Sequence, residues 1–266
     1  MWQRNLFMKT LRDLRGQILG WGLGAGILGW MVIFLYPPFQ DQMGPLMAML
    51  KSYPPALTAF FGDVTQMASY LGWLNLEFFS YGPPILAIFA VVAGSGLIAG
   101  EEEKGTLDLL LSHPIRRWRV VAEKFAAFVV ATIVIMVIIA LFFVSASAMI
   151  GQTKDLGRMG LATLNIAPIT IAGGALALMA SVLFRSRRLA TTLALVVIIG
   201  SFFLESLGKV VKVLEPYRPF TLFHYYNSNA ALLDKINWGD AAILLGLAAL
   251  FFAISLWAFQ RRDIAI

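Results

Sequence analysis

The residues of this sequence that could carry chemistry are a serine between two glycines, two histidines and a run of three glutamates. Ser95 lies in Gly-Ser-Gly, but Ala93 stands where the nucleophile turn G-x-S-x-G has its first glycine. Gly100 and Gly105 are spaced like the glycines of a phosphate-binding loop. No lysine follows Gly105, however, and the glutamates between would repel phosphate. The pattern therefore predicts neither a hydrolase nor an ATP-binding site.

The two histidines do not predict a metal site. Neither His113 nor His224 has other ligand-type residues nearby at metal-ligand spacing, and the topology argued below puts the two on opposite sides of a membrane. The chain has no cysteine, so it has neither disulfides nor thiolate sites. We therefore expect no metal and no cofactor in this chain, and no enzymatic activity of its own.

The elements that position these residues are long apolar runs. Of the 266 residues, 59% are hydrophobic and only 14% are charged, where a soluble domain has about 25% charged residues. A helix needs about 20 apolar residues to cross a bilayer, and backbone groups in lipid must pair within the segment. We therefore predict an all-α integral membrane protein with six transmembrane helices: Gln17–Tyr36, Phe78–Ile98, Phe125–Ile150, Gly160–Phe184, Leu189–Leu207 and Ala241–Phe259.

The distribution of lysine and arginine predicts the orientation. If both chain ends are cytoplasmic, fourteen basic residues lie inside and seven outside, as the positive-inside rule requires. The net charge of +6 is then a matter of topology and indicates no nucleic-acid partner. The inner set is Arg4, Lys9, Arg12, Arg15, Lys104, Arg116, Arg117, Arg119, Lys124, Arg185, Arg187, Arg188, Arg261 and Arg262.

The chain divides into a short surface helix and one membrane domain. Residues 1–16 have apolar side chains on one helical face and basic ones on the other, which predicts an amphipathic helix on the cytoplasmic surface. Residues 17–266 form a single six-helix domain with outer loops 37–77 and 208–240 and a cytoplasmic loop 99–124. Proline pairs in the first outer loop favour short interfacial helices over a seventh span.

Five glycines in the first span allow close approach of another helix. They are Gly20, Gly22, Gly24, Gly26 and Gly29, and they include small-xxx-small pairings. Two interpretations remain open: contact with a second copy of the chain, or ordinary packing within one copy.

The cytoplasmic loop 99–124 is the most informative stretch. A helix starting near Thr106 would place Leu107, Leu110 and Leu111 on one side and would end at Pro114. Acidic residues before it and basic residues after it suit the helix dipole. Such a helix either docks on a partner protein or dips its leucines into the lipid headgroups, and the residues alone leave both open.

The run AGEEEKGTLDLLLSHPIRR resembles the cytoplasmic loop of ABC-2 type permeases, the membrane subunits of ATP-binding-cassette exporters. The amphipathic start, the six spans, the reentrant-looking outer segment and the closing FQRRDI are similar too, so that the resemblance covers nearly the full length. It implies that the loop is a coupling helix that docks into the ATPase subunit. The implied coupling residues are Glu101, Glu102, Glu103, Gly105, Thr106, Leu107, Leu110, Pro114, Arg116 and Arg117. For the glutamates, a merely solvated charge run at a helix start is the alternative.

The resemblance implies alternating access in a complex of two permease copies, as a homodimer in the cytoplasmic membrane, with two ATPase subunits that bind ATP. An apolar path would suit an amphiphilic drug, peptide or lipid-like substrate. An ion-coupled carrier or channel usually needs an ionisable residue within the membrane, and Glu205 near the outer end of the fifth span is the one candidate. A membrane scaffold without transport is a third hypothesis.

Overall fold

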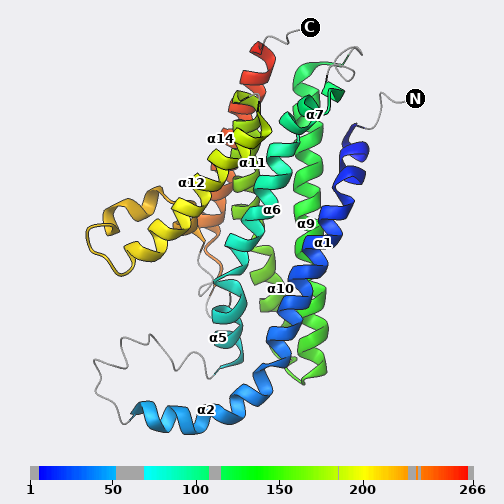
Figure 1. Ribbon diagram of the computed structural model, residues 1–266. Coiled ribbons are helices and arrows are strands. Elements are labelled where there is room, and N and C mark those ends of the chain that lie inside the picture. Colours follow the sequence, from blue (N-terminus) through cyan, green and yellow to red (C-terminus); the bar gives the residue numbers. More distant parts are fainter. Residues whose placement is uncertain are drawn as a thin grey trace.

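The computed structural model describes residues 6–51, 69–107, 115–184, 186–226, 232 and 235–262. All elements in these ranges are helical (Figure 1). The α-helices are α1 Leu6–Phe34, α2 Tyr36–Lys51, α5 Tyr70–Leu74, α6 Gly82–Gly96, α7 Ala99–Glu103, α9 Arg117–Met149, α10 Leu156–Leu164, α11 Ala167–Leu183, α12 Arg187–Gly208 and α14 Trp238–Arg261. A π-helix η2 spans Asn75–Phe79, and 3-10 helices η3 and η4 span Glu215–Phe220 and Leu222–Tyr225.

Six helical stretches of the described chain are long and apolar enough to cross a membrane. They are Leu6–Gln42, Tyr70–Gly96, Arg117–Met149, Leu156–Leu183, Arg187–Gly208 and Trp238–Arg261. The expectation of an all-α membrane protein with six spans is therefore confirmed. Figure 1 shows α7, the start of α1 and the end of α14 at one end of the bundle and α2 and α5 at the other. We call these the α7 end and the α2 end.

The surface helix expected over residues 1–16 has no boundary with the first span. The helix α1 runs without interruption from Leu6 to Phe34, because no proline interrupts its hydrogen bonds. The chain bends only at Leu35, before Pro37 and Pro38 in the first turn of α2. Proline is tolerated there since the first amides of a helix have no partner within it.

The fourth span, expected as one helix over residues 160–184, is interrupted. The helices α10 and α11 meet at Asn165 and Ile166, because Pro168 has no N–H to donate to the carbonyl of Leu164. The second span shows a related interruption before its own proline pair, where the π-helix Asn75–Phe79 precedes α6. Sequence periodicity did not reveal either break.

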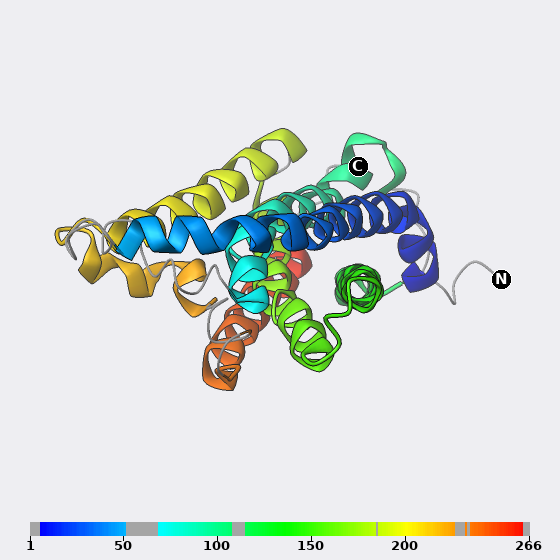
Figure 2. The same cartoon turned by 90° about the horizontal axis from the view of Figure 1, so that it is seen from below.

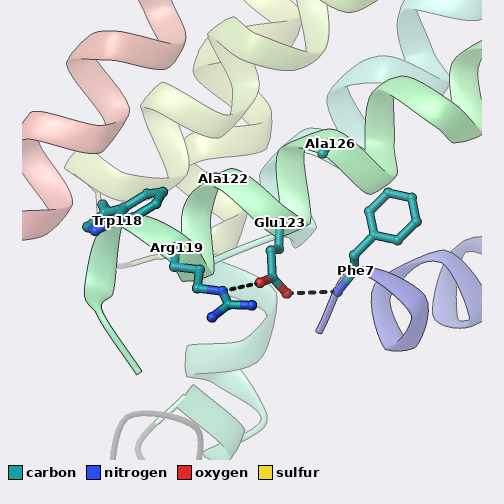
Figure 3. A pocket seen from close by; sticks show the side chains of 6 residues that line it. All are labelled: Phe7, Trp118, Arg119, Ala122, Glu123 and Ala126. Carbon is teal, nitrogen blue, oxygen red and sulfur yellow. Dashed lines mark hydrogen bonds and ion pairs between the residues drawn. The ribbon is translucent and has the colours of Figure 1, made fainter. Parts of the chain in front are cut away.

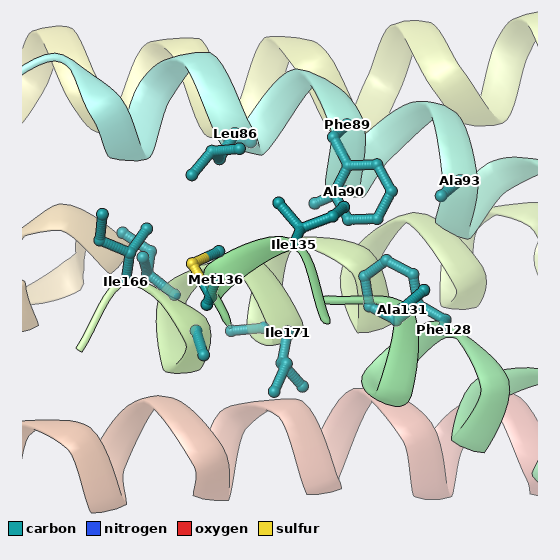
Figure 4. Packing of buried hydrophobic residues seen from close by; sticks show 14 of the residues in the cluster. Leu86, Phe89, Ala90, Ala93, Phe128, Ala131, Ile135, Met136, Ile166 and Ile171 are labelled. Carbon is teal, nitrogen blue, oxygen red and sulfur yellow. The ribbon is translucent and has the colours of Figure 1, made fainter. Parts of the chain in front are cut away.

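Helix α11 forms the centre of the bundle and packs against α6 and α14, while α1 packs along α9. Viewed along the bundle, α12 and α14 lie at its periphery on different sides (Figure 2). Figure 4 shows the buried core, where Phe89 of α6 and Phe128 of α9 stack with ring centroids 5.7 Å apart. Gly94 in α6 and Gly174 in α11 allow these two helices to cross closely, since a Cβ on Gly94 would lie 2.4 Å from the carbonyl oxygen of Gly174.

The first-span glycines divide into two sets. A Cβ on Gly26 or Gly29 would collide with the rings of Phe142 and Phe143 in α9, and one on Gly22 would press on Ile138. Packing within one chain therefore accounts for these three. Gly20 and Gly24 have no neighbouring atom within 4 Å of a Cβ position.

Candidate functional site

The three consecutive glutamates each bind a different element, although Glu103 is exposed. Glu101, in α7, accepts a hydrogen bond from the ammonium of Lys124 at 2.8 Å, and Lys9 in α1 lies 3.8 Å away. The hydroxyl of Thr106 donates to the carboxylate of Glu101 and lies 3.1 Å from its backbone carbonyl. Glu101 thus ties the start of the loop to both α9 and α1.

Burial makes the pair of Glu101 and Lys124 electrostatically strong. Only 3% of the Lys124 side chain and 14% of that of Glu101 are exposed. Burial by itself would raise the pKa of Glu101, but the charge of Lys124 and the hydrogen bonds from Lys124 and Thr106 outweigh it. With a further contribution from Lys9, they lower the pKa to about 2. Glu101 is therefore ionised at neutral pH and holds a buried lysine in place.

Glu102 is bound by the end of the last span. Both of its carboxylate oxygens accept hydrogen bonds from Nη2 of Arg262, at 2.8 and 3.0 Å. The backbone carbonyl of Arg262 accepts a bond of 2.7 Å from Nη1 of Arg117, the first residue of α9. The loop thus holds the end of α14 from two sides.

Glu103 caps the start of α12. Its carboxylate accepts the backbone N–H of Arg187 at 3.2 Å, where the first amides of a helix lack partners and the dipole favours a negative charge. The Arg187 side chain lies against Gly96 and Gly100, whose Cβ positions would be 3.4 and 3.8 Å from it. Ser186 adds a second cap by accepting from Leu189.

A fourth carboxylate, Glu123 in α9, binds the start of α1. It accepts the backbone N–H of Phe7 at 3.2 Å and also pairs with Arg119, as the dashed lines in Figure 3 show. These residues line an open pocket of about 480 Å³, together with Trp118, Ala122 and Ala126. The described residues of 101–123, which include the start of α9, therefore make polar contacts with α1, α12 and the end of α14.

The other residues that the sequence predicts for coupling differ in exposure and in conformation. Gly105 takes a left-handed φ of +65°, which glycine adopts without steric cost, so it turns the chain after α7. Leu107 is buried, and Thr106 and Leu107 are helical. Arg116 precedes α9 and is exposed. Leu110 and Pro114 lie outside the described residues, as do Leu111 and His113.

Sequence reasoning missed the partners of the glutamates. Lys124, Arg187 and Arg262 were used only to orient the chain in the membrane. The signal was nevertheless present, because each basic residue stands at the end of a span that terminates near the same loop. Charge counting alone did not pair them, since the distance between them in sequence reaches 160 residues.

The ionisable residue near the other end of α12 is neutralised. Glu205, 5% exposed, accepts two hydrogen bonds from Arg218 at 2.8 and 3.2 Å, and Nδ1 of His224 lies 3.4 Å from its carboxylate. A Cβ on Gly208 would lie 2.5 Å from the Arg218 side chain, so glycine makes room for this pair. Glu205 therefore binds residues of both η3 and η4 to α12. Its carboxylate is paired and is not free for ion coupling.

Comparison with known protein families gives a match. The family described as ABC-2 family transporter protein matches residues 5–264, nearly the whole chain. No curated protein sequence matches. The match includes Arg262 and residues 99–107, which contain the three glutamates and which we call the glutamate segment.

Proposed function

This chain belongs to the ABC-2 transporter family and is a membrane permease of an ABC transporter; from this premise we propose that it exports an amphiphilic substrate, powered by separate ATPase subunits. The working unit is two permease copies, a homodimer, with two ATPase subunits that bind and hydrolyse ATP. The α7 end of the bundle faces the cytoplasm, as the positive-inside rule favours.

The observation that carries this proposal is the attachment of the glutamate segment to the ends of several spans. Glu101, Glu102 and Glu103 bind Lys124, Arg262 and the amide of Arg187, which belong to three different helices. A solvated charge run would have no partners within the protein, whereas each of these carboxylates has one, so the geometry favours a mechanical role. A partner that displaces residues 99–107 would displace α9, α12 and α14 with them.

The bonds that the glutamates make within the permease change which residues we expect to face the partner. Lys104, Gly105 and Arg116 are exposed, and the side chains of Lys104 and Arg116 make no such bonds among the described residues. We assign contact with the ATPase to this exposed surface and assign the glutamates to attachment within the permease. Thr106 supports the attachment, since its hydroxyl binds Glu101.

The substrate class follows from the character of the spans. The central parts of the six spans contain no Asp, Glu, Lys or Arg. Such an interior offers no charged partner to a metal ion or a sugar phosphate, whereas an amphiphilic drug, peptide or lipid can be accommodated. The energy for transport then has to come from outside the membrane, which agrees with an ATPase partner.

The absence of cysteine allows a direct test. We would place a single cysteine at Lys104, exposed beside the glutamates, and in a matched variant at Val213, 77% exposed near the other end of α12. A short photo-crosslinker at position 104 should capture an ATP-binding subunit in membranes, and one at position 213 should not. In intact cells, a membrane-impermeant maleimide should label position 213 and spare position 104. Labelling of 104, or capture of the subunit only from 213, would overturn the assignment.

A further inference from the structure

Arg262, which directly follows α14, is held more firmly than a surface arginine usually is. Long charged side chains at the surface normally keep their charged ends in water. Only 12% of the Arg262 side chain is exposed, however, and its guanidinium binds both carboxylate oxygens of Glu102. The preceding residue provides a contrast: Arg261 lies over the ring of Trp257, 4.6 Å from its centroid, with no ion pair among the described residues.

Two independent bonds attach the same residue to the loop. The side chain of Arg262 binds Glu102, and its carbonyl accepts from Arg117. In the sequence, Glu102 precedes Lys104, Gly105 and Arg116 and Arg117 follows them, so the end of α14 is bound both before and after the residues to which we assign the ATPase contact. Both bonds to Glu102 come from one nitrogen, Nη2, and each is strengthened by the opposite charges.

Helix α14 can carry a displacement across the bilayer. It runs for 24 residues without proline, which corresponds to about 36 Å at 1.5 Å per residue. It packs along the central helix α11 and reaches η4 at its other end. Just after η4, the hydroxyl of Tyr226 donates to the carbonyl of Phe79 at 3.1 Å, beside the interruption of the second span. One rigid helix therefore connects the glutamate segment with the far side of the bundle.

We propose that Arg262 is a positioning residue that makes α14 move together with α7 when the ATPase subunits close. The proposal rests on the proposed function, since it needs an ATPase that displaces the loop. It adds a second route to the one through Lys124, and it distinguishes Arg262 from its neighbour Arg261.

The test measures the distance between spin labels on the loop and on α14. Cysteines at Lys104 and Leu250, both exposed, would be labelled in a chain that has no other cysteine. Labelled permease, diluted with unlabelled copies and bound to its ATPase in nanodiscs, would be compared before and after trapping with ADP and vanadate. The wild-type distance should stay the same, and in R262Q it should change on trapping. The exchange E102R/R262E should restore the wild-type result, and R261Q should behave as wild type.

The outcomes separate this inference from the proposed function. If R262Q still traps nucleotide with its ATPase and the label distance also remains constant, Arg262 does not position α14 and the inference is wrong. The same holds if the wild-type distance changes as much as that of R262Q, or if the exchanged pair fails to restore it while the fold is intact by thermal unfolding. If the wild-type permease binds no ATPase at all, the proposed function fails first.

Discussion

The carboxylate of Glu101 and the ammonium of Lys124 lie 2.8 Å apart, although 23 residues separate them in the sequence. The first belongs to α7 and the second is buried in α9. The contact joins α7 to α9 at the base of the loop. The same end of the bundle holds the contacts of Glu102, Glu103 and Glu123.

Removing the negative charge of Glu101 should destabilise the protein more than removing the positive charge of the exposed Lys9. In E101Q, Lys124 stays buried without a counter-charge, which costs on the order of 3 kcal/mol. In K9Q the pair with Lys124 is intact, and the exposed Lys9 contributes less than about 1 kcal/mol. Thermal unfolding in detergent would compare the two variants. Equal stability of E101Q and wild type would show that the pair does not hold the loop.

The contribution of Glu101 should depend on pH in a defined window. Its pKa is about 2 in the folded protein against an ordinary value of 4.5, so it stabilises the fold fully above pH 4.5. This stability is lost as the pH falls from 4.5 towards 2. The difference in unfolding temperature between wild type and E101Q should therefore shrink over this range. A difference that stays constant down to pH 2 would contradict the assigned ionisation.

The crossing of α6 and α11 should be intolerant of a single methyl group. In G94A the new Cβ would lie 2.4 Å from a backbone oxygen, so we expect a loss of about 1–3 kcal/mol. The control G200A places a methyl group in α12, where no atom lies within 4 Å, and should be neutral or gain up to about 1 kcal/mol. Unfolding in detergent measures both. A G94A protein as stable as G200A would mean that the two helices cross with more space.

The stability of the interruption in the second span, at Asn75–Phe79, should depend on the hydroxyl group of Tyr226. The carbonyl of Phe79 receives no helical hydrogen bond from Pro83, which has no N–H, and Tyr226 supplies the donor. Y226F should therefore cost about 1–3 kcal/mol and loosen the outer loop. Y225F removes an exposed bond to Pro219 and should cost less than about 1 kcal/mol. Amide hydrogen exchange over residues 75–82 would report the difference, and equal exchange in the two variants would contradict it.

The six spans could be predicted because an apolar run of 20 residues has few alternatives to a membrane helix. The boundaries were less accurate where proline decides them. Pro168 divides the fourth span into α10 and α11, and a hydropathy window that averages over 20 residues does not register one missing N–H. The opposite error occurred at residue 16, where a change from polar to apolar composition suggested a boundary but the helix continues.

The three glutamates were also singled out from the sequence, but the partners of their side chains were not. Three successive glutamates could face water, an ATPase or the bundle, and the choice depends on which cations end nearby in space. Arg262 lies 160 residues from Glu102, and only the packing of α14 on α11 brings it there. The last span therefore had to be placed before the partner of Glu102 could be assigned.

The central claim is that this permease works with a separate ATPase, and native mass spectrometry of the tagged chain, gently purified from its own membranes, tests it most directly. The account predicts a complex of two permease chains of 29.3 kDa each with two ATP-binding subunits. E101Q and E102Q should loosen the attachment of the loop and reduce the bound ATPase, whereas R261Q should not. Recovery of the chain alone, or with a partner that binds no nucleotide, would contradict the account.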